Sequence, residues 1–148
     1  VGFAGNIKII EKYDPSLPCI NGDHDQLVQI FLNLVKNAAE AIKHKNGEIV
    51  LHTSYQHSVH FALPGNTART HLPLVVTVQD NGIGIPFVVQ DNLFDAFITS
   101  KSNGTGLGLA LVAKMIDDHG GIIEFDSNPG KTLFRVMLPM SSDTNVDG

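Results

Sequence analysis

Asp80 is the last residue of the apolar run LVVTVQD at 74–80, and the glycine-rich turn NGIGIP follows it. An ionised carboxylate only accepts hydrogen bonds, so it suits an exocyclic amine such as that of adenine and repels a carbonyl oxygen at the same place. Gly82 and Gly84 allow the backbone to approach a flat base closely. The alternative is a tight turn capped by the aspartate, for which DNG is a common sequence.

Three glycines alternate at 104, 106 and 108, directly before an apolar helical pattern. Such glycines can present successive backbone N–H groups to an anion, and the helix that follows adds its positive end. This arrangement binds phosphates, although a hinge without a ligand has the same composition. The sequence contains no GxxxxGK[ST], which excludes a P-loop, and GxGxG after the polar loop TSKSN disfavours a dinucleotide fold.

Asn33 and Asn37 lie one turn apart on a predicted amphipathic helix over 26–43. Asparagine is a mediocre residue for the middle of a helix, because its amide competes for nearby backbone groups. An ordinary solvated face explains the pair, but so does a cation site, since Mg²⁺ accepts amide oxygens alongside water and phosphate oxygens.

Periodicity and turn residues predict the helices and strands that carry these groups. Asp23 offers an N-cap for the helix over 26–43, and a second helix starts near Thr105 and ends at Gly120–Gly121. We expect a long surface connection over 56–73. Extended segments are expected at 7–12, 18–22, 48–55, 74–80, 122–126 and 132–139, the last two forming a hairpin across SNPGK.

Composition limits the class of protein. With 148 residues, 43% of them hydrophobic, we expect one domain over 1–140 and a disordered tail over 141–148. A net charge of -5 argues against nucleic acid or an anionic membrane as partner. The single cysteine, Cys19, favours a reducing compartment, and no apolar run approaches the about 20 residues of a membrane span. We therefore expect a cytoplasmic protein.

Taken in order, the motifs resemble those of a known family. NLVKNA at 33–38 looks like the N box, DNGIGIP at 80–86 the G1 box, LFDAF at 93–97 the F box, and GTGLGL at 104–109 the G2 box, followed by NPGKT at 128–132. Over about residues 6–139 the sequence resembles the catalytic, ATP-binding domain of bacterial sensor histidine kinases. Gyrase B, Hsp90 and MutL belong to the same superfamily.

The resemblance implies a fold and a set of site residues. The fold is a two-layer α/β (α+β) sandwich of the Bergerat type, with a mixed sheet packed on helices and a lid at about 86–104. By position, Asn37 corresponds to the Mg²⁺ ligand, Asn33 to a second polar group near the phosphates, Asp80 to the adenine reader and Lys101 to a cation for the terminal phosphates. Thr132 supports the adenine through water. Further ATP contacts are expected at Gly82, Gly84, Gly104, Thr105, Gly106, Leu107 and Gly108, while Phe94 and Phe97 are either lid anchors or core aromatics.

The resemblance also implies a reaction. We expect the chain to bind ATP and Mg²⁺ and to donate the γ-phosphoryl group to a histidine on a separate dimerisation and phosphoacceptor domain of the same parent protein, upstream of a response regulator. None of the 7 histidines lies in an HExxNP-like context. An amide at 33, where hydrolysing relatives carry a glutamate, cannot act as a general base for water.

Alternatives remain open. The chain is also compatible with a self-sufficient ATPase, a protein-serine kinase of the anti-sigma type, or a nucleotide-sensing module without catalysis. Glu40 and Ala41 depart from a basic residue and an aromatic that many relatives carry. Within the family, the sequence looks most like the soluble nitrogen-regulation sensor kinases.

Overall fold

The computed structural model describes residues 6–18, 20, 22–57, 60–62, 69–95 and 108–140. Its elements, in chain order, are β1 (Lys8–Lys12), α1 (His24–Ala41), β2 (Glu48–Tyr55), β3 (His60–Ala62), β4 (Arg69–His71), β5 (Leu74–Asp80), α2 (Phe87–Gln90), α3 (Gly108–Asp118), β6 (Ile122–Asn128) and β7 (Lys131–Leu138). The predicted strands over 7–12, 48–55, 74–80, 122–126 and 132–139 and both predicted helices are confirmed, with ends shifted by a few residues.

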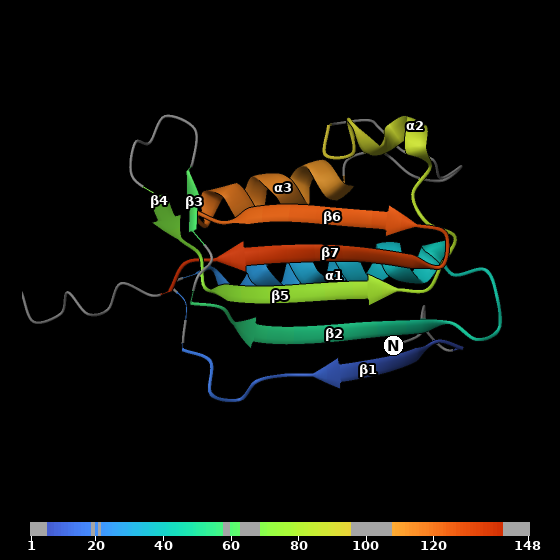
Figure 1. Cartoon of the computed structure of the whole chain (residues 1–148), viewed down its shortest axis with the longest axis horizontal. Helices are drawn as coiled ribbons and strands as arrows, with labels where there is room; N and C mark the ends of the chain where they lie inside the picture. Colours follow the sequence, from blue (N-terminus) through green and yellow to red (C-terminus); the bar gives the residue numbers. More distant parts are fainter. Residues whose placement is uncertain are drawn as a thin grey trace, which may run out of the picture.

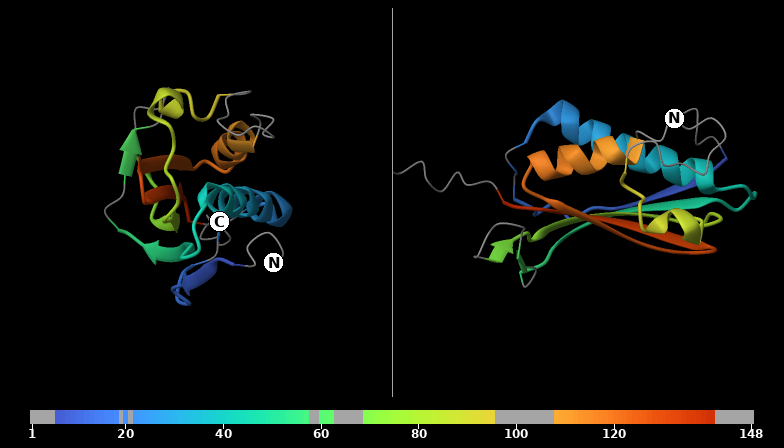
Figure 2. Two further views of the ribbon diagram at one scale, coloured as in Figure 1. Left: turned by 90° about the vertical axis from the view of Figure 1, so that its right-hand side faces the viewer. Right: turned by 90° about the horizontal axis from the view of Figure 1, so that it is seen from above.

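Five strands form one sheet in the order β1-β2-β5-β7-β6. The β1–β2 pair is parallel and the other three pairs are antiparallel, so the sheet is mixed. Helices α1 and α3 lie side by side against one face of this sheet (Figure 1 and Figure 2). The expected two-layer α/β sandwich is confirmed.

The core lies between the two layers. α1 contributes the buried Ile30, Leu34 and Ala38, which are spaced four residues apart and so share one face of the helix. α3 adds Val112, Met115 and Ile116, and the sheet adds residues such as Val78 and Phe134. The oxygen Oδ1 of Asp23 accepts a hydrogen bond from the N–H of Gln26 at 3.1 Å, so the predicted N-cap of α1 is confirmed.

One expectation about the connections is wrong. The segment 56–73 is not a plain surface connection, because β3 and β4 pair within it and Leu72 and Pro73 are buried. Strands of three residues are too short to show an alternating pattern in the sequence. Of the segment expected to be extended at 18–22, residues 18, 20 and 22 are described, and none of them belongs to a strand. The expected tail at 141–148 lies outside the described residues.

The ends of the elements define two sides of the molecule. β5 and β6 end, β7 begins, and α1 ends at one edge of the sheet, where α2 also lies (Figure 1). The β3–β4 hairpin lies at the opposite edge (Figure 1 and Figure 2). In the described part of the chain, no helix has both the length and the apolar character needed to cross a membrane.

We predict that α1 is stabilised mainly by its buried leucine. Leu34 is 0% exposed and Leu32, on the same helix, is 49% exposed. Leu34→Ala should lower the free energy of unfolding by about 2–5 kcal/mol, because it leaves a cavity in a packed core. Leu32→Ala, the matched control, should cost less than about 1 kcal/mol in the same urea titration. Equal losses in the two variants would contradict this packing.

Candidate nucleotide site

Asp80 occupies the last position of β5 and is buried at 4% exposure. Residues 74, 76 and 78 point the same way along the strand, and Leu74 and Val78 belong to the core between sheet and helices. Asp80 therefore places a carboxylate at the end of a row of mainly apolar side chains on β5. Among the described residues, the only hydrogen bond to this carboxylate comes from the N–H of Gly82, which lies 2.8 Å from Oδ1.

Burial raises the pKa of Asp80 above the ordinary range of an aspartate, and the hydrogen bond from Gly82 lowers it in part. Desolvation is the larger effect, so water alone stabilises the ionised form poorly at this place. An oxygen with no described donor is free to accept a hydrogen bond from a ligand. The geometry therefore suits a neutral donor such as an exocyclic amine.

The turn after Asp80 approaches its neighbours too closely for side chains. A Cβ atom on Gly82 would lie 2.5 Å from the carbonyl oxygen of Ala41, at the end of α1. Gly84 has a φ of 87°, and its Cβ would meet the carbonyl oxygen of Asn128 at 3.0 Å. Both predicted glycines are thus required by the backbone packing, and Gly84 also by its left-handed conformation.

Backbone hydrogen bonds fix this turn against two other elements. The N–H of Ile83 donates to the carbonyl of Ala41 at 2.9 Å, and the N–H of Gly130 donates to the carbonyl of Gly82 at 2.9 Å. The turn is therefore held between the end of α1 and the β6–β7 hairpin.

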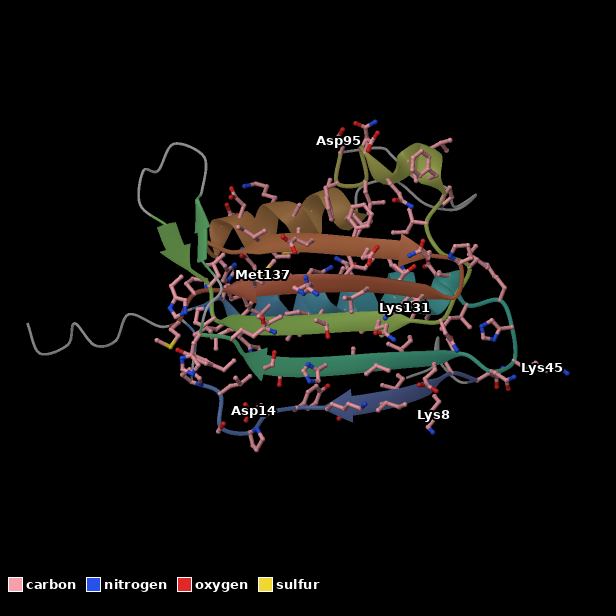
Figure 3. The ribbon with its side chains drawn as sticks, viewed as in Figure 1. Lys8, Asp14, Lys45, Asp95, Lys131 and Met137 are labelled. Carbon is pink, nitrogen blue, oxygen red and sulfur yellow. The ribbon has the colours of Figure 1, made fainter. Side chains whose placement is uncertain are left out.

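Thr132 lies next to Asp80 across the sheet. The two residues are paired in the β5–β7 register, and Thr132 is 3% exposed. Lys131, the residue before it, marks this edge of the sheet in Figure 3. A buried carboxylate and a buried hydroxyl thus lie side by side at this end of the sheet.

Asn33 and Asn37, the two asparagines predicted to form a site, lie on the side of α1 that ends next to this turn. Asn33 and Asn37 are half-buried, and they precede Ala41 by eight and four residues, so all three lie on one stripe. Because Ala41 contacts Gly82, the stripe runs from the turn along α1. Within the described part of the chain, no group of three or more His, Cys, Asp or Glu could hold a metal ion, so a cation here would depend on amide oxygens and on the ligand's own oxygens.

Several predicted residues lie outside the described part of the chain: Lys101, Gly104, Thr105, Gly106 and Leu107, with Phe97. Gly108 begins α3 and is exposed, and a Cβ atom there would meet nothing within 4 Å. Phe94 packs against Phe125 and Phe134, with ring centroids 5.9 and 6.5 Å apart. Of the two expectations for Phe94, a lid anchor or a core aromatic, these contacts match the core aromatic.

The sequence analysis did not identify Asn81 as the residue that fixes the end of β5. Its Oδ1 accepts from the N–H of Glu48 at 2.8 Å, and its Nδ2 donates to the carbonyl of Asn46 at 2.9 Å. Nε2 of His44 lies 2.9 Å from the carbonyl oxygen of Asn81. These bonds tie the end of β5 to the α1–β2 connection, whose Lys45 projects from the molecule in Figure 3. The sequence indicates only a turn residue at Asn81, because its hydrogen-bond partners are 33 and 35 residues away in the chain.

Comparison with known proteins gives a family and close relatives. A sequence profile described as "Histidine kinase-, DNA gyrase B-, and HSP90-like ATPase" matches residues 22–142. The Sensory histidine kinase/phosphatase NtrB of Azospirillum brasilense is 65% identical over 99% of this chain and 37% of that protein. The protein of the same name from Rhizobium leguminosarum bv. phaseoli is 54% identical over 99% of this chain and 38% of its own length. The chain thus spans little more than a third of these relatives.

Solved structures of sensor kinases have the same fold. The mycobacterial sensor histidine kinase MprB matches with a TM-score of 0.72 and 25% identity, over 92% of this chain and 85% of that one. The catalytic domain of histidine kinase ThkA matches with a TM-score of 0.70 and 28% identity, over 92% and 82%. Full-length ShkA in complex with AMPPNP matches with a TM-score of 0.70 and 27% identity, over 93% of this chain and 27% of that one.

We predict that the buried carboxylate reduces the stability of the ligand-free protein at neutral pH. A folded-state pKa above that of the unfolded chain favours folding at acidic pH, and this contribution is lost as pH rises through the folded pKa of Asp80. Asp80→Asn keeps an oxygen for the Gly82 N–H, so its melting temperature should equal or exceed that of the wild type at neutral pH. The difference should shrink as the pH falls.

The control for that experiment is Asp126→Asn, which alters an exposed aspartate on β6. Thermal unfolding followed by circular dichroism from acidic to neutral pH should show no such pH-dependent gain in the control. A lower melting temperature for Asp80→Asn than for wild type at neutral pH would contradict the role given to burial.

We also predict that Gly82 tolerates no side chain. Gly82→Ala should lower the free energy of unfolding by roughly 1–3 kcal/mol, because the new methyl group meets the backbone of Ala41 and the turn must shift. Gly108→Ala, in open space at the start of α3, should not lower stability. Denaturant titration of the two variants measures the difference, and an unaffected Gly82→Ala would show that the turn is not packed on α1.

Proposed function

Since the chain belongs to the family of histidine kinase-, DNA gyrase B- and HSP90-like ATPases, we propose that it binds ATP with Mg²⁺ and supplies the γ-phosphoryl group to a histidine on another domain of its parent protein. ATP binding follows from membership of this family. The transfer to histidine, the role of Mg²⁺ and the roles of individual residues are proposals.

The observation that carries the proposal is the buried Asp80 carboxylate at the end of β5. It is buried beside Thr132, with its Oδ1 fixed by the Gly82 N–H and no described donor on Oδ2. Adenine presents an amine donor, for which such a carboxylate is the matching acceptor, whereas guanine presents a carbonyl oxygen there. The solved neighbour ShkA, whose structure includes the ATP analogue AMPPNP, supports the same class of ligand.

We propose that the phosphates lie along the stripe of α1 that carries Asn33 and Asn37. Asn37 and Asn33 lie on the stripe that starts at the Gly82 contact, so a nucleotide whose base meets Asp80 can extend its phosphates along α1. Asn37 is the proposed Mg²⁺ ligand, and Asn33 a second polar group near the phosphates. A bound Mg²⁺ would neutralise charge on the phosphoryl oxygens. Lys101, Gly104, Thr105, Gly106, Leu107 and Gly108 are proposed to contact the phosphates.

The residue at 33 favours transfer over hydrolysis. An amide has no proton-accepting role at neutral pH, so Asn33 cannot activate water as a general base. In the proposed reaction a ring nitrogen of the acceptor histidine attacks the γ-phosphorus, a P–N bond forms, the bond to the β-phosphate oxygen breaks, and ADP leaves. The chain contributes positioning and charge stabilisation rather than a nucleophile.

The relatives suggest which kind of parent protein contains this chain. NtrB proteins carry the printed name sensory histidine kinase/phosphatase, and this chain matches little more than a third of them. We propose that the parent protein is a nitrogen-regulation sensor kinase whose remaining length includes the dimerisation and phosphoacceptor domain. Its further partner is then a response regulator. Because ATP is supplied in the cytoplasm, the proposal places the reaction there.

The test is phosphotransfer between separate proteins. The chain is mixed with γ-labelled ATP, Mg²⁺ and a purified histidine-bearing domain from the parent protein, and the partner should gain an acid-labile label. A partner lacking that histidine should stay unlabelled. Acid-stable label would indicate a serine kinase instead, and steady phosphate release by the chain alone would indicate an ATPase.

Asn37→Ala should reduce this transfer by about 100-fold or more, because loss of a metal ligand removes several kcal/mol of stabilisation of the transferred group. Gln29→Ala, an exposed polar position two turns earlier on α1, is the matched control and should transfer at the wild-type rate. Normal transfer by Asn37→Ala would exclude the assigned metal role.

A further inference from the structure

His119, the residue after α3, connects the end of α3 to the start of α1. Its Nδ1 lies 2.7 Å from the carbonyl oxygen of Met115, and its Nε2 accepts from the N–H of Asp23 at 3.1 Å. Met115 belongs to the last turn of α3, and Asp23 is the N-cap of α1. One imidazole ring thus bridges the two helices that cover the sheet.

The two partners determine which ring nitrogen of His119 carries the proton. A carbonyl oxygen only accepts hydrogen bonds, and a backbone N–H only donates them. Nδ1 must therefore carry the proton and Nε2 the lone pair, so the ring is the neutral Nδ1–H tautomer. A proton added to Nε2 would abolish the bond to Asp23, because two donors would then face each other.

Packing also holds the ring in this place. His119 is half-buried, and the backbone of Gly22 lies against it. A Cβ atom on Gly22 would lie 3.0 Å from Cδ2 and 3.1 Å from Nε2 of His119. A side chain at position 22 would therefore displace the ring from the N–H of Asp23.

The bridge bears on the proposed phosphate site because α1 and α3 run in opposite directions (Figure 1 and Figure 2). The end of α3 meets the start of α1 at His119, so the start of α3 at Gly108 lies toward the end of α1. Asn37, the proposed Mg²⁺ ligand, belongs to this later part of α1. The proposed phosphate contacts thus lie on two helices whose alignment His119 fixes from the far end.

The surroundings of Asp80 are held by other contacts. In the described part of the chain, the hydrogen bonds of the turn after Asp80 go to the end of α1, the start of β2 and the β6–β7 hairpin, and none goes to α3. A shift of α3 relative to α1 should therefore alter contacts to the phosphates and leave contacts to the base unchanged.

We propose that His119 is a positioning residue for the triphosphate: as the neutral Nδ1–H tautomer, it aligns α3 with α1 and so sets the spacing of the two helices that contact the phosphates. This inference rests on the proposed binding of ATP. Without the bond to Asp23, α3 can shift along α1, and the phosphate contacts lose their spacing.

Titrations with ATP and Mg²⁺ and with adenosine, followed by NMR chemical shifts of the chain, test the proposal. Adenosine has the same base but no phosphates. His119→Phe keeps a ring without nitrogen atoms and should weaken ATP binding by about 3- to 10-fold, the usual effect of one hydrogen bond. Adenosine binding should not change, so the ATP-to-adenosine affinity ratio should fall. His119→Gln, whose amide oxygen can accept from the N–H of Asp23, should recover part of the ratio.

Acidification provides a second measurement. Between about pH 7.5 and about pH 5.5, where histidines take up protons, the ratio of the wild type should fall more than that of His119→Gln, whose amide does not titrate. The two proteins share the other charged or titratable groups at this joint, so the difference between them isolates the ring. These groups are Asp23, His24 and Asp25 at the start of α1, and Lys114, Asp117 and Asp118 on α3.

The controls separate positioning from a general loss of structure. His24→Phe alters an exposed histidine at the start of α1 and should leave the ratio unchanged. Gly22→Ala tests the same joint from its other side, even if His119→Phe does not fold. Its methyl group should displace the ring and lower the ratio.

An unchanged ratio in His119→Phe or in Gly22→Ala, or equal weakening of ATP and adenosine, would overturn the positioning role while leaving ATP binding intact. The same pH dependence in the wild type and in His119→Gln would overturn the role of Nε2. Failure of the wild type to bind ATP at all would instead overturn the proposed function on which this inference rests.

Discussion

A carboxylate at the end of an apolar strand face is the constraint on which the site depends. Asp80 continues the row of β5 that packs against the helices, where burial raises its pKa and disfavours its charge. The described residues supply one hydrogen bond, from Gly82. The ligand-free fold therefore holds a charged group where burial disfavours charge. Proteins retain such local conflicts where function requires them.

The neighbouring elements hold this carboxylate in a fixed backbone frame. Ala41 at the end of α1 leaves no space for a side chain on Gly82, and Gly130 of the β6–β7 hairpin bonds the same turn from the other side. Asn81 binds the α1–β2 connection. All of these contacts join segments far apart in the chain, so the surroundings of Asp80 form only when the sheet and α1 have assembled. Fixed positions of donors and acceptors are what allow a site to discriminate between two purines.

The layers were predictable from the sequence because their signals are local. α1 has a long helical period, β5 a run of β-branched residues, and β6 and β7 alternate around a Pro-Gly turn. The ordered boxes identified the family, which the profile match confirms. The β3–β4 hairpin and the four-residue α2 were missed because such short elements have no measurable period. Asp80, Gly82, Gly84 and Thr132 do gather at one edge of the sheet, but Asn81 acts through partners that only the assembled sheet reveals.

We propose that the ionised Asp80 carboxylate binds the base of ATP. A calorimetric titration of the wild type and of Asp80→Asn with ATP and Mg²⁺ under identical conditions measures this contact. The substitution should weaken ATP binding by roughly 10- to 100-fold, the effect of losing a hydrogen bond to a charged group. Equal affinities for ATP in the two proteins would contradict it.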